Sequence, residues 1–261
     1  MPNDLLGSVR RALRVLDYIA EAGGSAAPRE IAAATGSNIS TVYHVLNTLA
    51  TDGYAERDDG TGRYRLGRKV APLGNAFIRS LPVAPNLYPV VRRLAEAAGD
   101  DAYLAILAGG HVVIAEIVET SKHPRVYPGY TAHLHARAIG KAVLAYCDAD
   151  FVRAHFEDSP PQRLTARTLT TLPAIEAELA RVRAQGYAED IEEFADGVCC
   201  IAAPVFDGRG AVYGAIAVSI PALRYRSSSA TAHDAVIAAA GAATAALTDE
   251  VRRFAAGTRT S

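Results

Sequence analysis

The sequence predicts an α+β protein made of two folded domains joined by a helix. The first eighty residues combine short amphipathic helices with one hairpin pattern, a proline-rich segment follows, and the remainder alternates strand-type and helix-type patterns. The chain has 261 residues and half of them are apolar, which is enough for a core in each domain. We place the domains at residues 1–67 and 85–255, with a linker helix in residues 68–84.

The first predicted helix begins with Ser8 as its cap and ends near Ala22, before Gly23-Gly24. Its apolar residues recur at helical spacing, so we expect them to form one face. They are Val9, Leu13, Leu16 and Ile19, with Ala12, Val15 and Ala20 beside them.

The next two helices have the spacing of a helix-turn-helix. Pro28 occupies the first turn of the earlier helix, and Gly36 ends it. The later helix is expected to start at Ser37 as N-cap and to bury Val42, Val45, Leu46 and Leu49. Its exposed residues are short donors and acceptors that suit phosphates and base edges in a major groove, which predicts a DNA-reading helix. They are Asn38, Ser40, Thr41, Tyr43, His44 and Asn47.

A β-wing is predicted after this helix, from strands at Tyr54–Arg57 and Arg63–Leu66 around a glycine-containing turn. We expect Arg57, Arg63 and Arg65 to reach the DNA backbone or minor groove. The net charge is +2 over residues 1–80 and −3 over the rest. This small difference favours the first domain as the one that faces DNA phosphates. A module that binds only proteins is the alternative, because it has the same helix pattern.

The linker helix is predicted at about residues 68–80, with Val70, Leu73, Ala76 and Phe77 on one face. Beyond it, paired strand patterns and helices predict one antiparallel sheet with helices packed on it. The expected helices are 87–98, 138–147, 172–185 and 230–251, and the expected strands are 102–107, 111–118, 126–128, 201–206 and 212–220.

Three cysteines, two of them adjacent, indicate no disulfide framework and fit a reduced cytoplasmic setting. The N-terminus lacks the continuous apolar segment of a signal peptide. The alanine-rich segment 235–247 is too short to span a bilayer. We therefore expect a cytoplasmic protein that has no membrane partner.

The first domain resembles the DNA-binding domain of the IclR family of transcriptional regulators nearly end to end. The shared motifs are Arg11-Ala12-Leu13, Glu30-Ile31-Ala32, Thr35-Gly36, Ser40-Thr41-Val42, Leu46, Thr48-Leu49, Gly53-Tyr54 and Tyr64-Arg65-Leu66-Gly67. The family usually has arginine where this chain has His44. Arginine binds guanine or phosphate through two donors, so the resemblance implies DNA binding with a different operator sequence.

The rest of the chain resembles the family's GAF-like effector-binding domain, so that the resemblance covers about residues 8–250. The matching motifs are Leu94-Ala95-Glu96, residues 138–145 (AIGKAVLA), Leu164-Thr165 with Thr168, Gly186-Tyr187, Asp190, Glu192-Glu193, Gly197, residues 200–207 (CIAAPVFD), Gly214-Ala215-Ile216 and Ser219. This resemblance implies a transcriptional regulator that binds double-stranded DNA at a palindromic operator as a homodimer or homotetramer. A repressor of a catabolic operon is the expected role.

The candidate effector site is the segment His135–Lys141, where a loop leads into a helix. The first N–H groups of a helix have no partner within it, so they attract a carboxylate, although water or a capping side chain can also satisfy them. In the family this helix start holds the effector's polar end, which implies that Ala138 and Ile139 are the backbone donors here.

The resemblance also implies pocket contacts at Asp190, Cys200, Ala217 and Ser219. Regulators that bind small acids tend to have serine where this chain has Ala217, and the lost hydroxyl makes the pocket less polar. We therefore expect an aromatic or bulky carboxylic effector rather than glyoxylate or pyruvate. Its wall is predicted from Tyr103, Ile106, Tyr127, Tyr130 and Leu134. Asp190 either accepts a hydrogen bond from the effector or only caps a turn.

Two other functions remain open at this point. An enzyme could use Cys199 or Cys200, but no neighbouring histidine motif, phosphate loop or nucleophile elbow is evident. A metal sensor could use His123, His133 and His135 with Asp190 and Cys200. Histidines in polar loops are more often solvated, and we expect no catalytic residue, metal or cofactor.

Overall fold

The computed structural model describes residues 6–120 and 126–257, with side chains described as far as residue 249. The chain forms two compact units, residues 1–80 and residues 81–261. The prediction for His123 lies outside the described residues.

The first unit is a helical domain with a small antiparallel sheet of order β1-β3-β2. Its elements are α1 (Gly7–Glu21), β1 (Ser25–Ala26), α2 (Pro28–Thr35), α3 (Ile39–Thr51), β2 (Ala55–Arg57), β3 (Tyr64–Leu66) and α4 (Val70–Ser80). The helix-turn-helix, the wing and the linker helix are thus confirmed. The two-residue strand β1 was not expected; it pairs with β3.

Three details of the first unit differ from the prediction. Ser8 does not cap α1, because the helix begins at Gly7 and Leu6 is at the N-cap without a side-chain bond. Asn38, not Ser37, caps α3. The apolar residues of α1 form two faces: Val15 and Ile19 enter the core, whereas Leu6, Val9 and Leu13 remain exposed.

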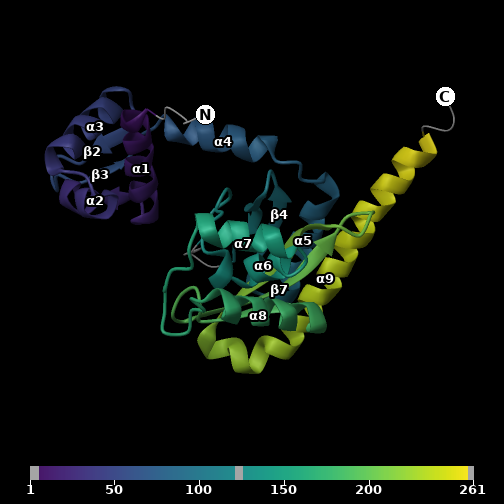
Figure 1. Cartoon of the computed structure of the whole chain (residues 1–261). Helices are drawn as coiled ribbons and strands as arrows, with labels where there is room; N and C mark the ends of the chain where they lie inside the picture. Colours follow the sequence, from purple (N-terminus) through teal and green to yellow (C-terminus); the bar gives the residue numbers. More distant parts are fainter. Residues whose placement is uncertain (1–5, 121–125, 258–261) are drawn as a thin grey trace. The chain divides into compact units, whose positions relative to one another are not determined.

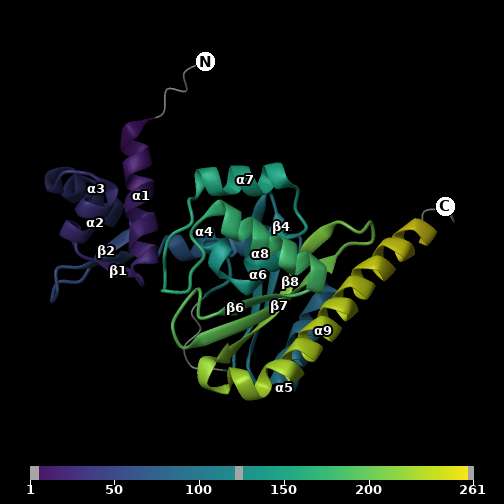
Figure 2. The ribbon, with the colours of Figure 1, turned by 60° about the horizontal axis from the view of Figure 1, so that its bottom comes forward.

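The second unit is a three-layer domain around a five-stranded antiparallel sheet of order β5-β4-β8-β7-β6. Its strands are β4 (Asp101–Ala108), β5 (His111–Val118), β6 (Ala188–Ile191), β7 (Val198–Phe206) and β8 (Val212–Pro221). Its helices are η1 (Pro85–Leu87), α5 (Tyr88–Ala98), η2 (Leu134–Ala136), α6 (Ala138–Leu144), α7 (Ala149–Asp158), α8 (Leu172–Gln185) and α9 (Ala222–Gly257). Figures 1 and 2 show α5 and α9 on one face of the sheet and α6, α7 and α8 on the other.

Strand alternation divides the interior of this domain into two cores. Leu104, Ile216 and Val218 face α5 and α9, whereas Tyr103, Ala215 and Ala217 face the layer of α6, α7 and α8. The predicted antiparallel sheet flanked by helices is therefore confirmed.

Several boundaries in the second unit differ from the prediction. The segment 126–128 is not a strand, although the nearby Gly129 N–H donates to the Ile114 carbonyl at 2.7 Å. The helix predicted over 138–147 ends at Leu144, and α9 begins eight residues earlier than the predicted position 230. The short elements α7 and β6 were not predicted.

Among the described residues, one helix has the length and composition to cross a membrane, α9 over Ala222–Asp249. In this domain the helix lies along the sheet (Figure 2). It contributes Val236, Ala240, Ala243 and Leu247 to the core that it shares with α5. A single helix of this length and composition is weak evidence for a membrane span, and the buried side chains of α9 belong to the core of this domain.

Candidate DNA-reading helix and effector cavity

Helix α3 presents a polar surface of short side chains in the first unit. The Asn38 carboxamide oxygen accepts the Thr41 N–H at 2.7 Å, so one predicted DNA contact is also the helix cap. Ser40, Tyr43 and His44 are exposed, and Thr41 is half-buried. This face is chemically suited to bases and phosphates.

The three wing arginines have different surroundings. Arg63 forms a two-point ion pair with Glu30, at 2.8 and 3.1 Å, and also donates to the Ser25 carbonyl oxygen. Arg65 pairs with Glu56 at 3.0 Å and remains exposed. Arg57 is exposed; its backbone pairs with Tyr64 in the wing, and its side chain forms no hydrogen bond or ion pair within the described ranges. Of the three, Arg57 is therefore the one available to DNA without breaking an internal contact.

In the second unit, the sheet register brings the predicted pocket residues together on one face. Asp190 of β6 is opposite Cys200 of β7, and Cys200 is opposite Ser219 of β8. The neighbouring row contains Ala217 opposite Tyr103 of β4. Because directly opposed residues share a face of an antiparallel pair, strand pairing alone builds this surface.

The start of α6 lies over that surface and forms one wall of a partly open cavity. The cavity has a volume of about 40 Å³, counted as the space open to the centre of a water molecule. Its lining residues are Tyr103, Val126, Arg137, Ala138, Ile139, Asp190, Phe194, Val198, Cys200, Ala217 and Ser219.

A close backbone approach positions the start of α6. A Cβ atom at Gly140 would be 2.4 Å from the Leu134 carbonyl oxygen, so glycine is required where η2 packs against α6. Arg137 is the N-cap, but its side chain does not cap the helix. Within the described residues, no side chain caps the N–H groups of Ala138 and Ile139.

Asp190 caps the turn after β6 and also lines the cavity, so its position is compatible with both of the roles expected from the sequence. It is 1% exposed, lines the cavity and accepts the N–H groups of Glu193 and Phe194 at 2.7 and 3.2 Å. Burial raises the pKa of its carboxyl to about 7, although the two amides lower it. The residue therefore fixes the turn after β6 and presents a carboxyl that titrates near neutral pH.

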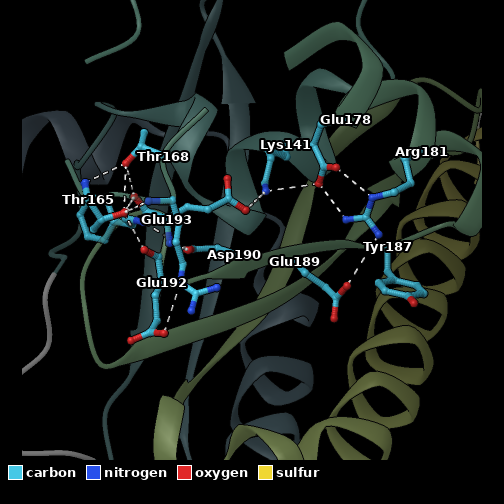
Figure 3. Close-up of polar contacts among 12 residues, drawn as sticks. Lys141, Thr165, Thr168, Glu178, Arg181, Tyr187, Glu189, Asp190, Glu192 and Glu193 are labelled. Atoms are coloured by element: carbon cyan, nitrogen blue, oxygen red, sulfur yellow. Dashed lines mark hydrogen bonds and ion pairs between the residues drawn. The ribbon is translucent and has the colours of Figure 1, made fainter. Parts of the chain in front are cut away.

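A buried ion network supports the cavity from the side of α6 (Figure 3). Lys141 is fully buried and pairs with Glu193 at 2.7 Å and with Glu178 of α8 at 3.3 Å. Glu178 also pairs with Arg181 at 2.8 Å. The backbone oxygen of Glu193 accepts the Thr168 hydroxyl at 2.7 Å. These contacts fix the loop after Asp190 relative to α6.

The structure brings together seven predicted effector contacts: Tyr103, Ala138, Ile139, Asp190, Cys200, Ala217 and Ser219. It does not place the other wall residues in the cavity lining. Tyr127 is 54% exposed, and Ile106 is on the opposite face of the sheet. Tyr130 packs edge-to-face on Phe194, and Leu134 is in the core below α6.

Three lining residues were not expected from the sequence: Val126, Phe194 and Val198. Arg137 lies within the expected segment His135–Lys141, but no role was assigned to its side chain. Phe194 and Val198 flank an irregular loop, where periodicity gives no information on orientation.

The structure also addresses the alternative functions. His133 has a left-handed backbone and His135 is in η2, so they do not share a strand face. The His135 ring contacts the Gln162 carbonyl at 2.9 Å, and the described ranges contain no group of three or more metal-ligating side chains. Burial raises the pKa of Cys199 to about 11 and also raises that of Cys200, so neither thiol is an activated nucleophile.

An exposed helix-turn-helix and a second domain with a small, mostly apolar cavity that contains a few polar groups are features of a DNA-binding regulator that senses a ligand. Comparison with known families identifies which class of regulator this is. The model for the IclR helix-turn-helix domain matches residues 8–59, and that for the C-terminal domain of bacterial transcriptional regulator IclR matches residues 75–245. The chain therefore belongs to the IclR family of transcriptional regulators.

Relatives of known name agree with this assignment. The transcriptional regulator BhcR of Paracoccus denitrificans is 40% identical over 233 residues, which cover 88% of this chain and 83% of that protein. The transcriptional repressor IclR of Escherichia coli is 30% identical, with coverage of 88% and 85%. A crystal structure of a putative IclR regulator from Silicibacter sp. TM1040 superposes with a TM-score of 0.67 at 30% identity, with coverage of 93% and 96%. These relatives are regulators, not enzymes, so the enzyme alternative is excluded.

Proposed function

We propose that this chain is a cytoplasmic repressor of a catabolic operon whose operator affinity is controlled by a small carboxylate effector. The observation that carries the proposal is the cavity of the second unit, where most of the predicted effector contacts meet. The exposed polar face of α3 supports the other half, namely recognition of DNA in the major groove.

The size of the cavity favours a small acid over the bulky aromatic acid that the sequence suggested. Its volume of about 40 Å³, counted as the space open to the centre of a water molecule, suits a compact acid better than a bulky one. Tyr127 and Tyr130 are also outside the lining, so the aromatic wall is reduced to Tyr103 and Phe194.

The proposal includes pairing of two or four chains, so that two α3 helices read a palindrome. It is supported by exposed apolar side chains at helical spacing on α1 and α4. On α1 they are Leu6, Val9 and Leu13, and on α4 they are Leu73 and Phe77. Such side chains usually mark an interface. Light scattering at micromolar concentration tests this part, and a monomer would contradict it.

Fluorescence anisotropy tests DNA recognition. The purified protein is titrated onto labelled DNA from upstream of its own gene, against random DNA of equal length. We expect tight, salt-dependent binding, and Arg57→Ala should weaken that binding about 10-fold. Arg63→Ala should also lower the stability of the domain, because it removes the contacts with Glu30 and Ser25. If Arg57→Ala and wild type bind equally, the wing does not contact DNA.

A further inference from the structure

We infer that Arg137 selects the effector by charge: its guanidinium binds the carboxylate of a small monocarboxylate, and neutral analogues are excluded. This inference rests on the proposed function, because it takes the cavity as the effector site. It goes beyond the helix-start amides and assigns effector recognition to a side chain that the sequence analysis did not single out.

Arg137 is a buried cation with few partners. It is 6% exposed and lines the cavity. A guanidinium carries five N–H donors, yet in the described ranges only one hydrogen bond is recorded for it, to the Ala132 carbonyl oxygen at 3.3 Å. No carboxylate in those ranges forms an ion pair with it. Most of its donors are therefore available to a ligand.

The remaining contacts orient the guanidinium without neutralising it. It stacks over the Tyr130 ring at 4.8 Å and lies 5.9 Å from the Phe194 ring centre. Cation–π contacts of this kind are weaker than a two-point pair with a carboxylate. Two aromatic rings thus fix a planar group whose fork of donors matches the geometry of a carboxylate.

The other groups around the cavity leave a net positive charge when Asp190 is protonated. Tyr103, Cys200 and Ser219 are neutral at pH 7. Asp190 is beyond ion-pair distance of Arg137, and one of its oxygens is occupied by two backbone N–H groups. Lys141 is paired with Glu193 and Glu178. A ligand with one negative charge balances Arg137, and the Asp190 carboxyl then meets a second polar group on that ligand.

Isothermal titration calorimetry of the full-length protein at pH 6.5 tests the inference. The probes are acetate, lactate and benzoate, each paired with its neutral amide. Wild type should bind at least one acid and none of the amides. Arg137→Met keeps the length and packing of the chain and should weaken acid binding about 10- to 100-fold, the usual size of a lost charge-assisted pair, with Arg137→Lys intermediate.

Arg153→Met on the surface of α7 is the matched control and should bind as wild type does. Thermal unfolding without ligand separates recognition from structure. Because the methionine removes an unbalanced buried charge, unliganded Arg137→Met should melt no lower than wild type. A lower melting temperature would make Arg137 a structural anchor and overturn the inference.

Two further results would also overturn it: unchanged acid affinity in Arg137→Met, or no binding of any probe acid by wild type. Anisotropy distinguishes this failure from failure of the proposed function. Suppose that an acid releases wild type from the upstream DNA, and that Arg137→Met binds this DNA but is not released by the acid. The proposed function and the inference about Arg137 then both hold. If wild type binds the acid through Arg137 but its affinity for DNA does not change, the inference about Arg137 holds and the proposed control of operator affinity by the effector fails.

Discussion

Arg137 and Lys141 are two buried cations one helical turn apart in the chain, and their surroundings are opposite. Lys141 touches two carboxylates, Glu193 and Glu178, and both come from other elements of the domain. Arg137 forms no ion pair among the described residues and faces the cavity. A buried charge that the fold itself neutralises holds structure together, whereas one left without a counter-ion indicates a site for a ligand of opposite charge.

The largest effect expected from this contrast is on the free energy of unfolding of Lys141→Met. Removing the lysine leaves the carboxylates of Glu193 and Glu178 buried without their shared cation, which should cost about 3–5 kcal/mol. Urea denaturation measures it, with Arg137→Met as the comparison variant. The contrast fails if the two variants unfold at the same urea concentration.

The next effect is a pH dependence that belongs to Asp190. Its folded-state pKa is about 7 against an ordinary value of 3.8. Between these values the folded protein holds a proton that the unfolded chain has lost, so the stability from this group falls as pH rises from about 4 to 7. Relative to Asp190→Asn, wild type should lose up to about 1.4 kcal/mol per pH unit in this window.

Denaturation of both proteins from pH 4.5 to 8 measures the difference. Parallel curves would mean that Asp190 titrates at its ordinary pKa. The same proton affects the effector, because an ionised Asp190 repels a carboxylate. Affinity for any acid that binds should therefore decline as pH rises through 7 in wild type and decline less in Asp190→Asn.

The smallest effect is expected at Arg181, a third cation in the same network (Figure 3). Its side chain is 46% exposed, so water replaces much of its contact with Glu178. Arg181→Gln should therefore cost no more than about 1 kcal/mol. A loss of stability as large as that of Lys141→Met would show that burial does not determine how much each ion pair contributes to the free energy of unfolding.

The regular elements were predictable because their apolar side chains recur at the spacing of a helix or a strand. Helix α8 was predicted with its exact bounds, and the β7–β8 hairpin from two apolar segments around a turn. Strand β6 has only four residues and includes Glu189 and Asp190, so its polarity hides the alternation. The strand predicted over 126–128 failed because two β-type residues do not outweigh a following Pro-Gly turn.

The candidate site was predictable where it depends on strand register and not where it depends on loops. Asp190, Cys200, Ala217 and Ser219 came from the resemblance, and the sheet register places them together. Arg137 was missed because sequence alone does not say whether an arginine points into a cavity or into solvent. Tyr127 was misplaced for the same reason.

The alternation of side chains across the sheet has a consequence for how this regulator diversifies. The cavity uses Tyr103, Cys200, Ala217 and Ser219, while their sequence neighbours Leu104, Ile201, Ile216 and Val218 face α5 and α9. Substitutions at the first set alter what is recognised and leave the core shared with α5 and α9 unchanged. Ligand preference can therefore drift through single mutations on one face of the sheet while the residues that hold α5 and α9 on the other face stay the same.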